Sequence, residues 1–473
     1  MLNIAIIIVY FLIMIGIGAY AYVKRETASN DGFFVANRRG SILFITGSLC
    51  ATFIGASVVV GMTGRGYTMG LTGAWWLLVG AIGLFILGFF FARRVRKIGL
   101  YTLPELLESQ YGPATGLTAS ILIVVAWIAI IAAQILAVQA ILSVILPVDV
   151  APWILMTSAA FIFIIYTILG GQFSIIRTDV VQFGILVVGI LIALGLVLYN
   201  VGGIGELRDA LDPEYFSLPI NNTFGWYDLV SLLILTGATY VVGPDMYSRL
   251  FCARDGNVAR ASALLAGIIA IPIAFIVVLI GMGAKILYPD IASGEAFPHI
   301  IENLLPVGVG GIVVAALLAA IMSSADTVLL TTSTIVSQDI VRKISPNIND
   351  RQGLLITRLG ILVIGIISLL VALQLEGIIS SLLLAYTIFT SGVVIPVIAG
   401  FFKDKLRVTT TGAMAAIIGG GGTALLINRL NHYDKLGGVE HLELVGLGVC
   451  IALLFGVSWV TKMMSPSTSE DFG

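Results

Sequence analysis

A short polar run lies inside one of the most apolar parts of this sequence. The run "SSADT" places Ser323, Ser324, Asp326 and Thr327 within the apolar segment 307–337. Carboxylate and hydroxyl oxygens are the ligands that hard cations prefer. A carboxylate in the middle of a membrane helix costs about 2.5–3.5 kcal/mol to insert, so it must face protein, water or a cation. These residue types at this spacing therefore favour a cation-binding face.

The polar residues of this segment share one side of the expected helix. They follow helical spacing and are Ser323, Asp326, Thr327, Thr331, Thr334 and Gln338. A lone serine or threonine in a membrane helix commonly bonds to a preceding carbonyl or packs against a neighbour, and that interpretation stays open for the serine pair taken alone. Asp326 favours a functional role for this face of the helix, because a buried carboxylate needs a partner.

Two further acids lie at the ends of expected spans. Asp179, in the segment "GGQFSIIRTDVVQF", opens a span and comes one turn before Gln182. An acid at a helix N-terminus also suits the helix dipole, so a structural role with Arg177 as its partner is the alternative. Asp245 comes four residues before Arg249, and this spacing predicts a mostly structural ion pair.

The overall composition is that of a membrane protein with many spans. The chain has 473 residues, of which 59% are hydrophobic and 11% charged, against roughly 25% charged in soluble domains. The formal net charge of −1 gives no indication of a nucleic-acid partner. The three cysteines are far apart, so no disulfide framework is expected. The three histidines lie in polar connections, which argues against an intramembrane zinc site.

The elements that must position the polar residues are membrane helices. Thirteen apolar runs are long enough to cross about 30 Å of hydrocarbon. They cover residues 2–23, 41–64, 70–92, 116–146, 151–169, 179–199, 226–248, 260–286, 307–337, 354–374, 378–402, 409–428 and 442–463. The predicted fold class is therefore all-α and polytopic, with about 13 transmembrane helices.

The distribution of basic residues predicts the orientation. Most of the 25 lysines and arginines fall on one side of the membrane if the N-terminus is outside, and the positive-inside rule then places the C-terminus in the cytoplasm. The first apolar run has no basic residues before it and is followed at once by "KRE", so we expect a retained helix rather than a cleaved signal peptide. No soluble domain is expected, and the predicted location is the cell membrane.

Two spans carry helix-breaking residues at corresponding places. The second contains the glycine-rich stretch "TFIGASVVVGMTGRGYTMG" (52–70), and the seventh contains Gly243 followed by Pro244. Because these spans cross in opposite directions, spans 2–6 and 7–11 predict two five-helix units of inverted topology. Broken helices at matching positions of such repeats indicate a midplane substrate and ion site in secondary transporters. The alternative is that the glycines only allow close helix packing.

These motifs resemble those of the sodium:solute symporter family. The family's glycine pair and its Thr-Asp-x-x-Gln pattern resemble a set of residues in this chain, namely Gly170, Gly171, Thr178, Asp179 and Gln182. Two further family motifs resemble the stretches "AAIMSSAD" (319–326) and "GPDMYSRLFCARD" (243–255). The resemblance covers nearly the whole chain and implies a LeuT-like core of two inverted five-helix repeats. We expect an extra helix and inner loop over 1–40, the repeats over 41–202 and 203–405, and two extra helices with a short tail over 406–473.

The resemblance implies a main sodium site built from neutral oxygens. Its members here are the carbonyls of Ala51, Ile54 and Ala320 and the hydroxyls of Ser323 and Ser324. Sodium is a hard cation, and unwound carbonyls at half-helix ends supply oxygens without a fixed charge.

A second sodium site is implied by positions that line one in some relatives. These are Asp179, Asp326 and Thr327, although Asp326 stands where some of those relatives carry Ser or Ala. Together with Ser324 they would hold a second cation, and we would then expect a sodium Hill coefficient above one and competition between sodium and protons. One or two sodium ions are therefore expected.

The substrate is expected between the two breaks and spans 4 and 11. Candidate lining residues are Phe53, Ser57, Gln134, Thr236, Tyr240 and Tyr386. Tyr240 matches a substrate-contacting tyrosine of the proline transporters. Sugar carriers have Asn and Gln where this chain has Phe53 and Val58, so a sugar fits poorly. High-affinity choline transporters have Trp in place of Gly243, and a quaternary ammonium needs aromatic neighbours.

The expected function follows from the ion site and the pocket. With no basic residue expected at mid-membrane, a carboxylate would rely on half-helix N-termini. We expect a sodium-coupled symporter, not an enzyme, in which a monomer suffices to import an amino acid such as proline or a small monocarboxylate. A proton-coupled symporter is the runner-up, and a sugar or choline-type substrate is a further alternative. The expected partners are the solute, sodium and the lipid bilayer, with no nucleic acid.

Overall fold

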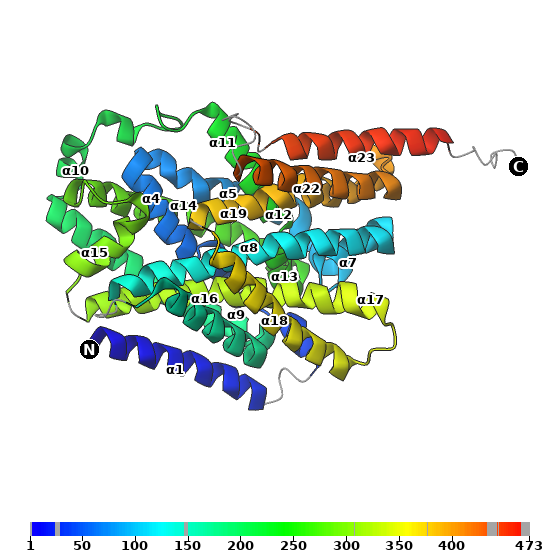
Figure 1. Cartoon of the computed structure of the whole chain (residues 1–473), viewed down its shortest axis with the longest axis horizontal. Coiled ribbons are helices and arrows are strands. Elements are labelled where there is room, and N and C mark those ends of the chain that lie inside the picture. The colour runs from blue at the N-terminus through cyan, green and yellow to red at the C-terminus, as the bar shows by residue number, and fades with distance from the viewer. Residues whose placement is uncertain are drawn as a thin grey trace, which may run out of the picture.

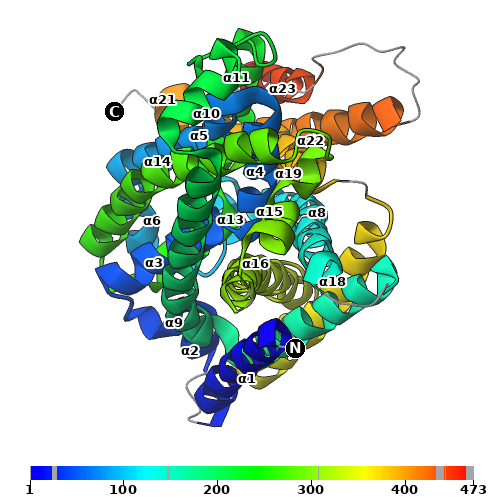
Figure 2. The same cartoon turned by 90° about the vertical axis from the view of Figure 1, so that its left-hand side faces the viewer.

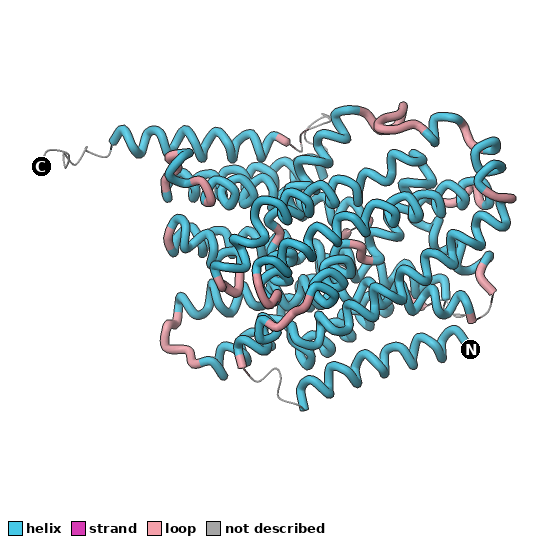
Figure 3. Tube along the Cα trace, turned by 180° about the vertical axis from the view of Figure 1, so that it is seen from behind, coloured by secondary structure: helices cyan, strands magenta, loops and turns pink. Residues whose placement is uncertain are grey.

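The described part of the chain is a bundle of helices. The computed structural model describes residues 2–23, 29–145, 150–306, 308–375, 377–432, 442 and 444–464. Over these residues no β-strand forms, and the only extended pairings are two isolated bridges. Most helices run along the long axis of the molecule (Figure 1), and the trace in Figure 3 is almost entirely helical. The predicted all-α class is confirmed.

The first part of the bundle extends to the end of a long helix. It comprises α1 (Leu2–Val23), α2 (Asn30–Val35), η1 (Ala36–Arg38), α3 (Ile42–Phe53), α4 (Ala56–Met69), η2 (Gly70–Ala74), α5 (Trp75–Ile86), η3 (Leu87–Phe91), α6 (Ala92–Ile98), α7 (Leu103–Tyr111), α8 (Pro113–Ile145) and α9 (Pro152–Val201). The η elements are short 3-10 or π-helical turns.

The remaining elements complete the bundle. They are α10 (Ile204–Ala210), η4 (Pro213–Phe216), α11 (Trp226–Leu232), η5 (Leu233–Gly237), α12 (Ala238–Val242), α13 (Pro244–Cys252), α14 (Gly256–Leu287), η6 (Ser293–Glu295), α15 (Ala296–Leu304), α16 (Val309–Ile335), η7 (Val336–Val341), α17 (Arg342–Ile344), α18 (Asp350–Ala372), α19 (Ile378–Phe389), η8 (Thr390–Val394), α20 (Ile395–Gly400), α21 (Lys403–Leu406), α22 (Thr410–His432) and α23 (Val445–Met464).

Many of these helices have the length and composition of membrane spans. In the described residues ten are long and apolar enough to cross a membrane, and shorter apolar helices cover Ala5–Met14 and Ile42–Phe53. All thirteen predicted spans fall on helices. The spans predicted over 151–169 and 179–199 form one helical run, α9, that departs from helical geometry at Gly171. The exact count of thirteen crossings remains a prediction.

The interruption of α9 requires glycine. Gly171 has φ +53°, and a Cβ there would lie 2.7 Å from Cδ2 of Phe33 in α2. Glycine adopts positive φ without the steric cost that a side chain brings. About two turns further along, α9 carries the fully buried Asp179.

Both breaks predicted in the second and seventh spans are confirmed. Ile54 and Gly55 separate α3 from α4, and Gly243 separates α12 from α13. Ile54 has ψ +46° and Gly243 has ψ +135°, both outside the helical range. Pro244 opens α13, where its missing N–H costs nothing and its fixed φ suits the first helical turn.

The polar helix α16 lies at the centre of the bundle. Nearly every residue from Gly310 to Ile335 is buried, and the helix packs against α9, α8, α1, α18 and α3. Figure 2 looks along the bundle and shows α16 surrounded by other helices. Its serines, threonines and carboxylate are therefore inside protein, where neighbouring helices supply polar partners and lipid does not.

Candidate functional site

The two serines of α16 meet the broken end of α3. Ser323 Oγ lies 3.1 Å from the carbonyl oxygen of Ala51 and 2.9 Å from that of Ala320, so its one O–H can donate to either. Ser324 Oγ lies 3.4 Å from the Ala51 carbonyl oxygen and 3.2 Å from that of Thr52. All five residues are buried. Four of the residues predicted for the main sodium site therefore form one cluster, and Thr52 joins them.

The end of α3 exposes carbonyl groups to this cluster because the helix stops there. The last four carbonyls of a helix lack intrahelical partners, and the negative end of the helix dipole lies at the same place. Ile54, the fifth predicted member, caps α3 and donates its N–H to the Cys50 carbonyl at 2.7 Å. At Gly55, a Cβ would lie 2.4 Å from Ser324 Oγ. Only glycine lets the break approach α16 so closely.

The cluster has the chemistry of a site for a hard cation. A hydroxyl group can turn its proton away and offer lone pairs, so serines that now donate to carbonyls can also bind a cation. Hydroxyl and carbonyl oxygens are hard ligands without net charge. Among the described residues, no three His, Cys, Asp or Glu side chains are grouped so that they could hold a metal ion. The neutral oxygens at the α3 break are the candidate ion ligands because both serine hydroxyls lie against carbonyl oxygens there.

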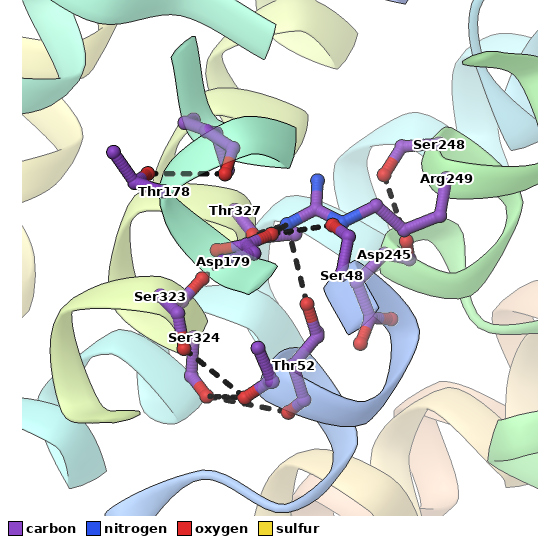
Figure 4. A network of polar contacts seen from close by, with 12 residues as sticks. Ser48, Thr52, Thr178, Asp179, Asp245, Ser248, Arg249, Ser323, Ser324 and Thr327 are labelled. Carbon is purple, nitrogen blue, oxygen red and sulfur yellow. Dashed lines mark hydrogen bonds and ion pairs between the residues drawn. The ribbon is translucent and has the colours of Figure 1, made fainter. Parts of the chain in front are cut away.

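A buried ion pair lies next to the cluster. Arg249 Nη2 is 3.0 Å from Asp179 Oδ2, and both side chains are fully buried. The same nitrogen donates to Thr52 Oγ1 at 3.2 Å and to Thr327 Oγ1, and Ser48 Oγ donates to Asp179 Oδ2. Figure 4 shows the arginine extending from α13 toward these groups of α3, α9 and α16. One guanidinium thus joins four elements in the core.

This pair corrects three sequence-based interpretations. Asp245 was expected to pair with Arg249, yet Asp245 is partly exposed and Arg249 turns inward to Asp179. Arg177 was the alternative partner of Asp179, but Arg177 is exposed and its guanidinium lies 4.0 Å from the centre of the Phe173 ring. No basic residue was expected at mid-membrane, yet Arg249 is fully buried beside the α3 break. A fully buried arginine needs an anionic partner that is equally buried, and Asp179 meets that condition.

Asp326 faces a different neighbour from Thr327. Its Oδ1 accepts a hydrogen bond from Thr167 Oγ1 of α9 at 3.0 Å, and the residue is 1% exposed. Among the described residues Asp326 forms no ion pair. Thr327 Oγ1 instead donates to the Ser323 carbonyl at 2.7 Å and accepts from Arg249. Of the residues predicted for a second sodium site, Thr327 therefore shares Arg249 with Asp179, whereas Asp326 bonds to Thr167.

Helix α1 contributes to the core, which the sequence did not indicate. Tyr10 accepts a hydrogen bond from Gln182 Nε2 at 2.9 Å and donates to Met322 Sδ at 3.6 Å. Met14 Sδ also accepts from Gln182, at 3.6 Å. The signal in the sequence was a tyrosine in the middle of an apolar span. Gln182, noted as one turn beyond Asp179, thus ties α1 to α9.

Three of the predicted substrate residues form an aromatic group beside the break. The rings of Phe53 and Tyr240 are 4.6 Å apart between centroids and tilted by 76°. The hydroxyls of Tyr240 and Tyr386 are 3.2 Å apart, and the Tyr386 and Trp76 rings are 6.2 Å apart. Arg65 continues this series, since its guanidinium carbon lies 5.1 Å from the centre of the Trp76 ring. Sequence reasoning missed both Trp76 and Arg65.

The other predicted substrate residues are placed less directly. Thr236 lies one turn before Tyr240 and is fully buried, and its Oγ1 has no hydrogen-bond partner among the described residues. Gln134 of α8 is 3% exposed, and its Oε1 likewise has none. Ser57 belongs to α4, but its side chain lies outside the described part of the structure. Unpaired buried oxygens are costly, so each of these two oxygens favours a polar partner.

Arg65, which contacts the Trp76 ring, lines two cavities, and Phe53, Tyr240 and Tyr386 line neither of them. One has a volume of about 200 Å³ and is lined by Arg65, Met69, Thr223, Phe224, Tyr227, Asp228, Ser231, Leu232, Leu235, Leu383 and Thr387. The other, of about 350 Å³, is lined by Val60, Gly61, Gly64, Arg65, Thr68, Ser293, Gly294, Gly377, Ile378, Ile379 and Ser380. Both lie against α4 and α19, the helices that follow the first break and carry Tyr386.

A helical membrane protein with two broken helices and a buried oxygen cluster at one of the breaks has the design of a secondary transporter. The model of the sodium:solute symporter family matches residues 33–420. The chain belongs to that family. Its members are sodium-coupled symporters of small solutes, so the protein is a multi-pass membrane transporter with sodium as the coupling ion.

Individual relatives agree with this assignment. The chain is 28% identical to a sodium/glucose cotransporter of Vibrio parahaemolyticus, over 88% of this chain and 83% of that protein. It is 25% identical to solute carrier family 5 member 4A of Mus musculus, over 97% and 80% of the two chains. A solved sodium-coupled sialic acid symporter, bound to substrate and outward-open, superposes with a TM-score of 0.79 at 20% identity, covering 97% of this chain and 98% of that one. The last likeness establishes the LeuT-like fold.

Proposed function

We propose that this protein imports a small organic solute across the cell membrane by alternating access, driven by sodium bound at the α3 break. The proposed ligands are the carbonyls of Ala51, Ile54 and Ala320 and the hydroxyls of Ser323 and Ser324. A monomer suffices for transport, with the N-terminus outside and the C-terminus in the cytoplasm. The observation that carries the proposal is the contact of both serine hydroxyls with the carbonyls at the end of α3.

An ion at this position couples its own binding to solute access. It would be held by α3 on one side and α16 on the other, so it stabilises the arrangement in which the two helices meet. A ligand shifts a conformational equilibrium by its difference in affinity for the two states. Sodium that binds only when the helices are together therefore favours that state, and the solute that binds beside the same break benefits from it.

The solute we propose is an amino acid such as proline, or a small monocarboxylate. Phe53, Tyr240 and Tyr386 offer an apolar wall with one hydroxyl pair, which suits a small and largely apolar body. Arg65 offers a guanidinium beside this wall, and guanidinium groups bind carboxylates through paired hydrogen bonds. Arg65 also lines the cavities of about 200 Å³ and 350 Å³, at or below the lower end of the roughly 300–1,000 Å³ that drug-sized ligands occupy, which supports a small solute.

The proposal is tested with the purified protein in two steps. Thermal unfolding in sodium, compared with potassium at the same ionic strength, should show stabilisation by sodium alone. Proline, other amino acids, monocarboxylates, glucose, sialic acid and choline are then added one at a time. The transported solute should raise the unfolding temperature further, and it should do so only when sodium is present. Uptake into proteoliposomes under a sodium gradient checks the coupling. Uptake driven by a proton gradient without sodium would instead support proton coupling, and a response to glucose, sialic acid or choline alone would replace the proposed solute class.

A further inference from the structure

A cavity at one end of the helix pair α22 and α23 carries two basic side chains. It has a volume of about 530 Å³, and Arg407 and Lys462 both line it. Both residues are exposed, and neither forms an ion pair with an acid in the described part of the chain. None of the described residues that line the cavity is acidic. The cavity therefore offers two positive charges to a ligand.

The packing of the two helices brings these charges together. Arg407 comes just before α22, and Lys462 lies in the last turn of α23. The helices pack side by side (Figure 1). Their ends are joined where the backbone N–H of Thr409 donates to Ser458 Oγ at 2.9 Å. A Cβ at Gly412 would overlap the same oxygen, so a glycine allows this close approach. Both charges are thus held at one end of the pair.

The other wall of the cavity is apolar and exposed. The exposed apolar side chains that line it are Leu406, Phe455, Trp459 and Met463. The last three are spaced four residues apart on α23, so they share one face of that helix. A tryptophan that is 64% exposed near the end of a membrane helix is typical of the boundary between lipid tails and headgroups. The apolar wall extends from this boundary toward the middle of α23.

We propose that this cavity binds an anionic phospholipid, with its phosphate between Arg407 and Lys462 and an acyl chain along the α23 face. Basic pockets between membrane helices bind anionic headgroups, and the cytoplasmic leaflet is the negatively charged one. This end of the pair is cytoplasmic in the predicted orientation. A guanidinium group binds phosphate oxygens through paired hydrogen bonds. A soluble anion would leave Phe455 and Trp459 without a partner, so the apolar wall favours a lipid.

A lipid in this position would strengthen the helix pair. Its phosphate would contact both the segment before α22 and the end of α23. These two helices also pack against η8, which directly follows α19 with Tyr386. A ligand that binds only the folded protein raises its stability, so the lipid should stabilise the protein whichever solute or ion it carries.

The test measures lipid binding to the purified full-length protein by native mass spectrometry. Phosphatidylglycerol and phosphatidylcholine with the same acyl chains are added separately. We expect phosphatidylglycerol to bind about tenfold more tightly, because two basic residues contact its charge. It should also raise the unfolding temperature. Glycerol phosphate carries the charge without acyl chains and should do neither at the same concentration.

Two charge variants separate the cavity from the general charge of the surface. Arg407→Gln/Lys462→Gln should reduce the binding of phosphatidylglycerol to that of phosphatidylcholine. Lys97→Gln/Arg351→Gln is the matched control, because it also removes one lysine and one arginine that are exposed, and neither lines the cavity. The control should keep the wild-type preference. Since all four side chains are exposed, the variants should fold as the wild type does.

A third pair of variants tests the apolar wall, and the outcomes decide the inference. Trp459→Ala should weaken phosphatidylglycerol binding, whereas Trp153→Ala, which removes a ring that is 59% exposed on α9, should not. Equal binding of the two lipids in wild type would overturn the inference, as would an unchanged preference in Arg407→Gln/Lys462→Gln. An equal response to glycerol phosphate would assign the cavity to a soluble anion instead. A protein dimer that Trp459→Ala abolishes, without any lipid preference, would assign the surface to a second copy of this chain.

Discussion

Arg249 Nη2 lies 3.0 Å from Asp179 Oδ2, and neither side chain has any exposed surface. The pair joins α13, which follows the second break, to the half of α9 that follows Gly171. Removing one partner of such a pair leaves an uncompensated charge in the core, whereas removing both does not. The pair is therefore a structural requirement of the site as well as an electrostatic one.

This relationship predicts a difference in thermal stability between single and double variants. Asp179→Asn and Arg249→Met should each destabilise the protein by about 3–5 kcal/mol, and the double variant by much less than the sum. Thermal unfolding of each purified protein measures this. Arg254→Gln is the matched control, because its pair with Asp255 is 63% and 50% exposed and should contribute under about 1 kcal/mol. Equal destabilisation by the single and double variants would contradict the pairing.

The serine cluster predicts a loss of sodium affinity without a loss of fold. Ser323→Ala and Ser324→Ala should each weaken sodium binding about tenfold or more, since a contact with a charged group contributes about 1.5–3 kcal/mol. Sodium titrations monitored by thermal shift provide the measurement. Ser333→Ala is the control, because Ser333 is equally buried on α16 but donates only to its own helix at Leu329. Unchanged sodium curves in both cluster variants would remove these serines from the site.

The close approach at Gly55 predicts that a single methyl group disturbs the ion site. A Cβ there would lie 2.4 Å from Ser324 Oγ, so Gly55→Ala should move either the break or the serine. We expect sodium-driven uptake to fall at least tenfold, with sodium affinity reduced in parallel, by analogy with other steric intrusions into packed cores. Gly184→Ala, where no atom lies within 4 Å, should leave both unchanged. A Gly55→Ala protein with normal sodium affinity would show that α3 and α16 can separate there freely.

The aromatic group predicts variants that weaken solute binding without changing sodium binding. Tyr240→Ala removes the ring packed on Phe53 and the hydroxyl beside Tyr386, so solute affinity should fall more than tenfold while sodium affinity stays within a few-fold. Tyr240→Phe removes only the hydroxyl and should cost about 0.5–1.5 kcal/mol of solute binding. Solute titrations at saturating sodium measure both. Normal solute affinity in Tyr240→Ala would place the pocket elsewhere.

The sequence alone determined the class of the protein and predicted the residues of the proposed ion site. Long apolar runs predict membrane helices because only helices satisfy every backbone group in lipid. Gly243 with Pro244, and the glycines after Phe53, predicted breaks that the structure confirms, because these residues interrupt helices through their own backbone properties. Ser323 and Ser324 were predicted as ligands for a similarly local reason, because their hydroxyl groups lie in an apolar segment where lipid offers no hydrogen-bond partner.

Only the tertiary structure decided which side chains meet. Arg249 reads as an inner-loop residue by charge counting, because nothing local shows that the helix after the second break directs a long side chain into the core. Asp326 and Thr327 follow one another and seemed to share a site, yet neighbouring residues on a helix point about 100° apart. One therefore reaches Thr167 of α9 and the other Arg249 of α13. The packing of distant helices around α16 determines those partners, and no local pattern carries that information.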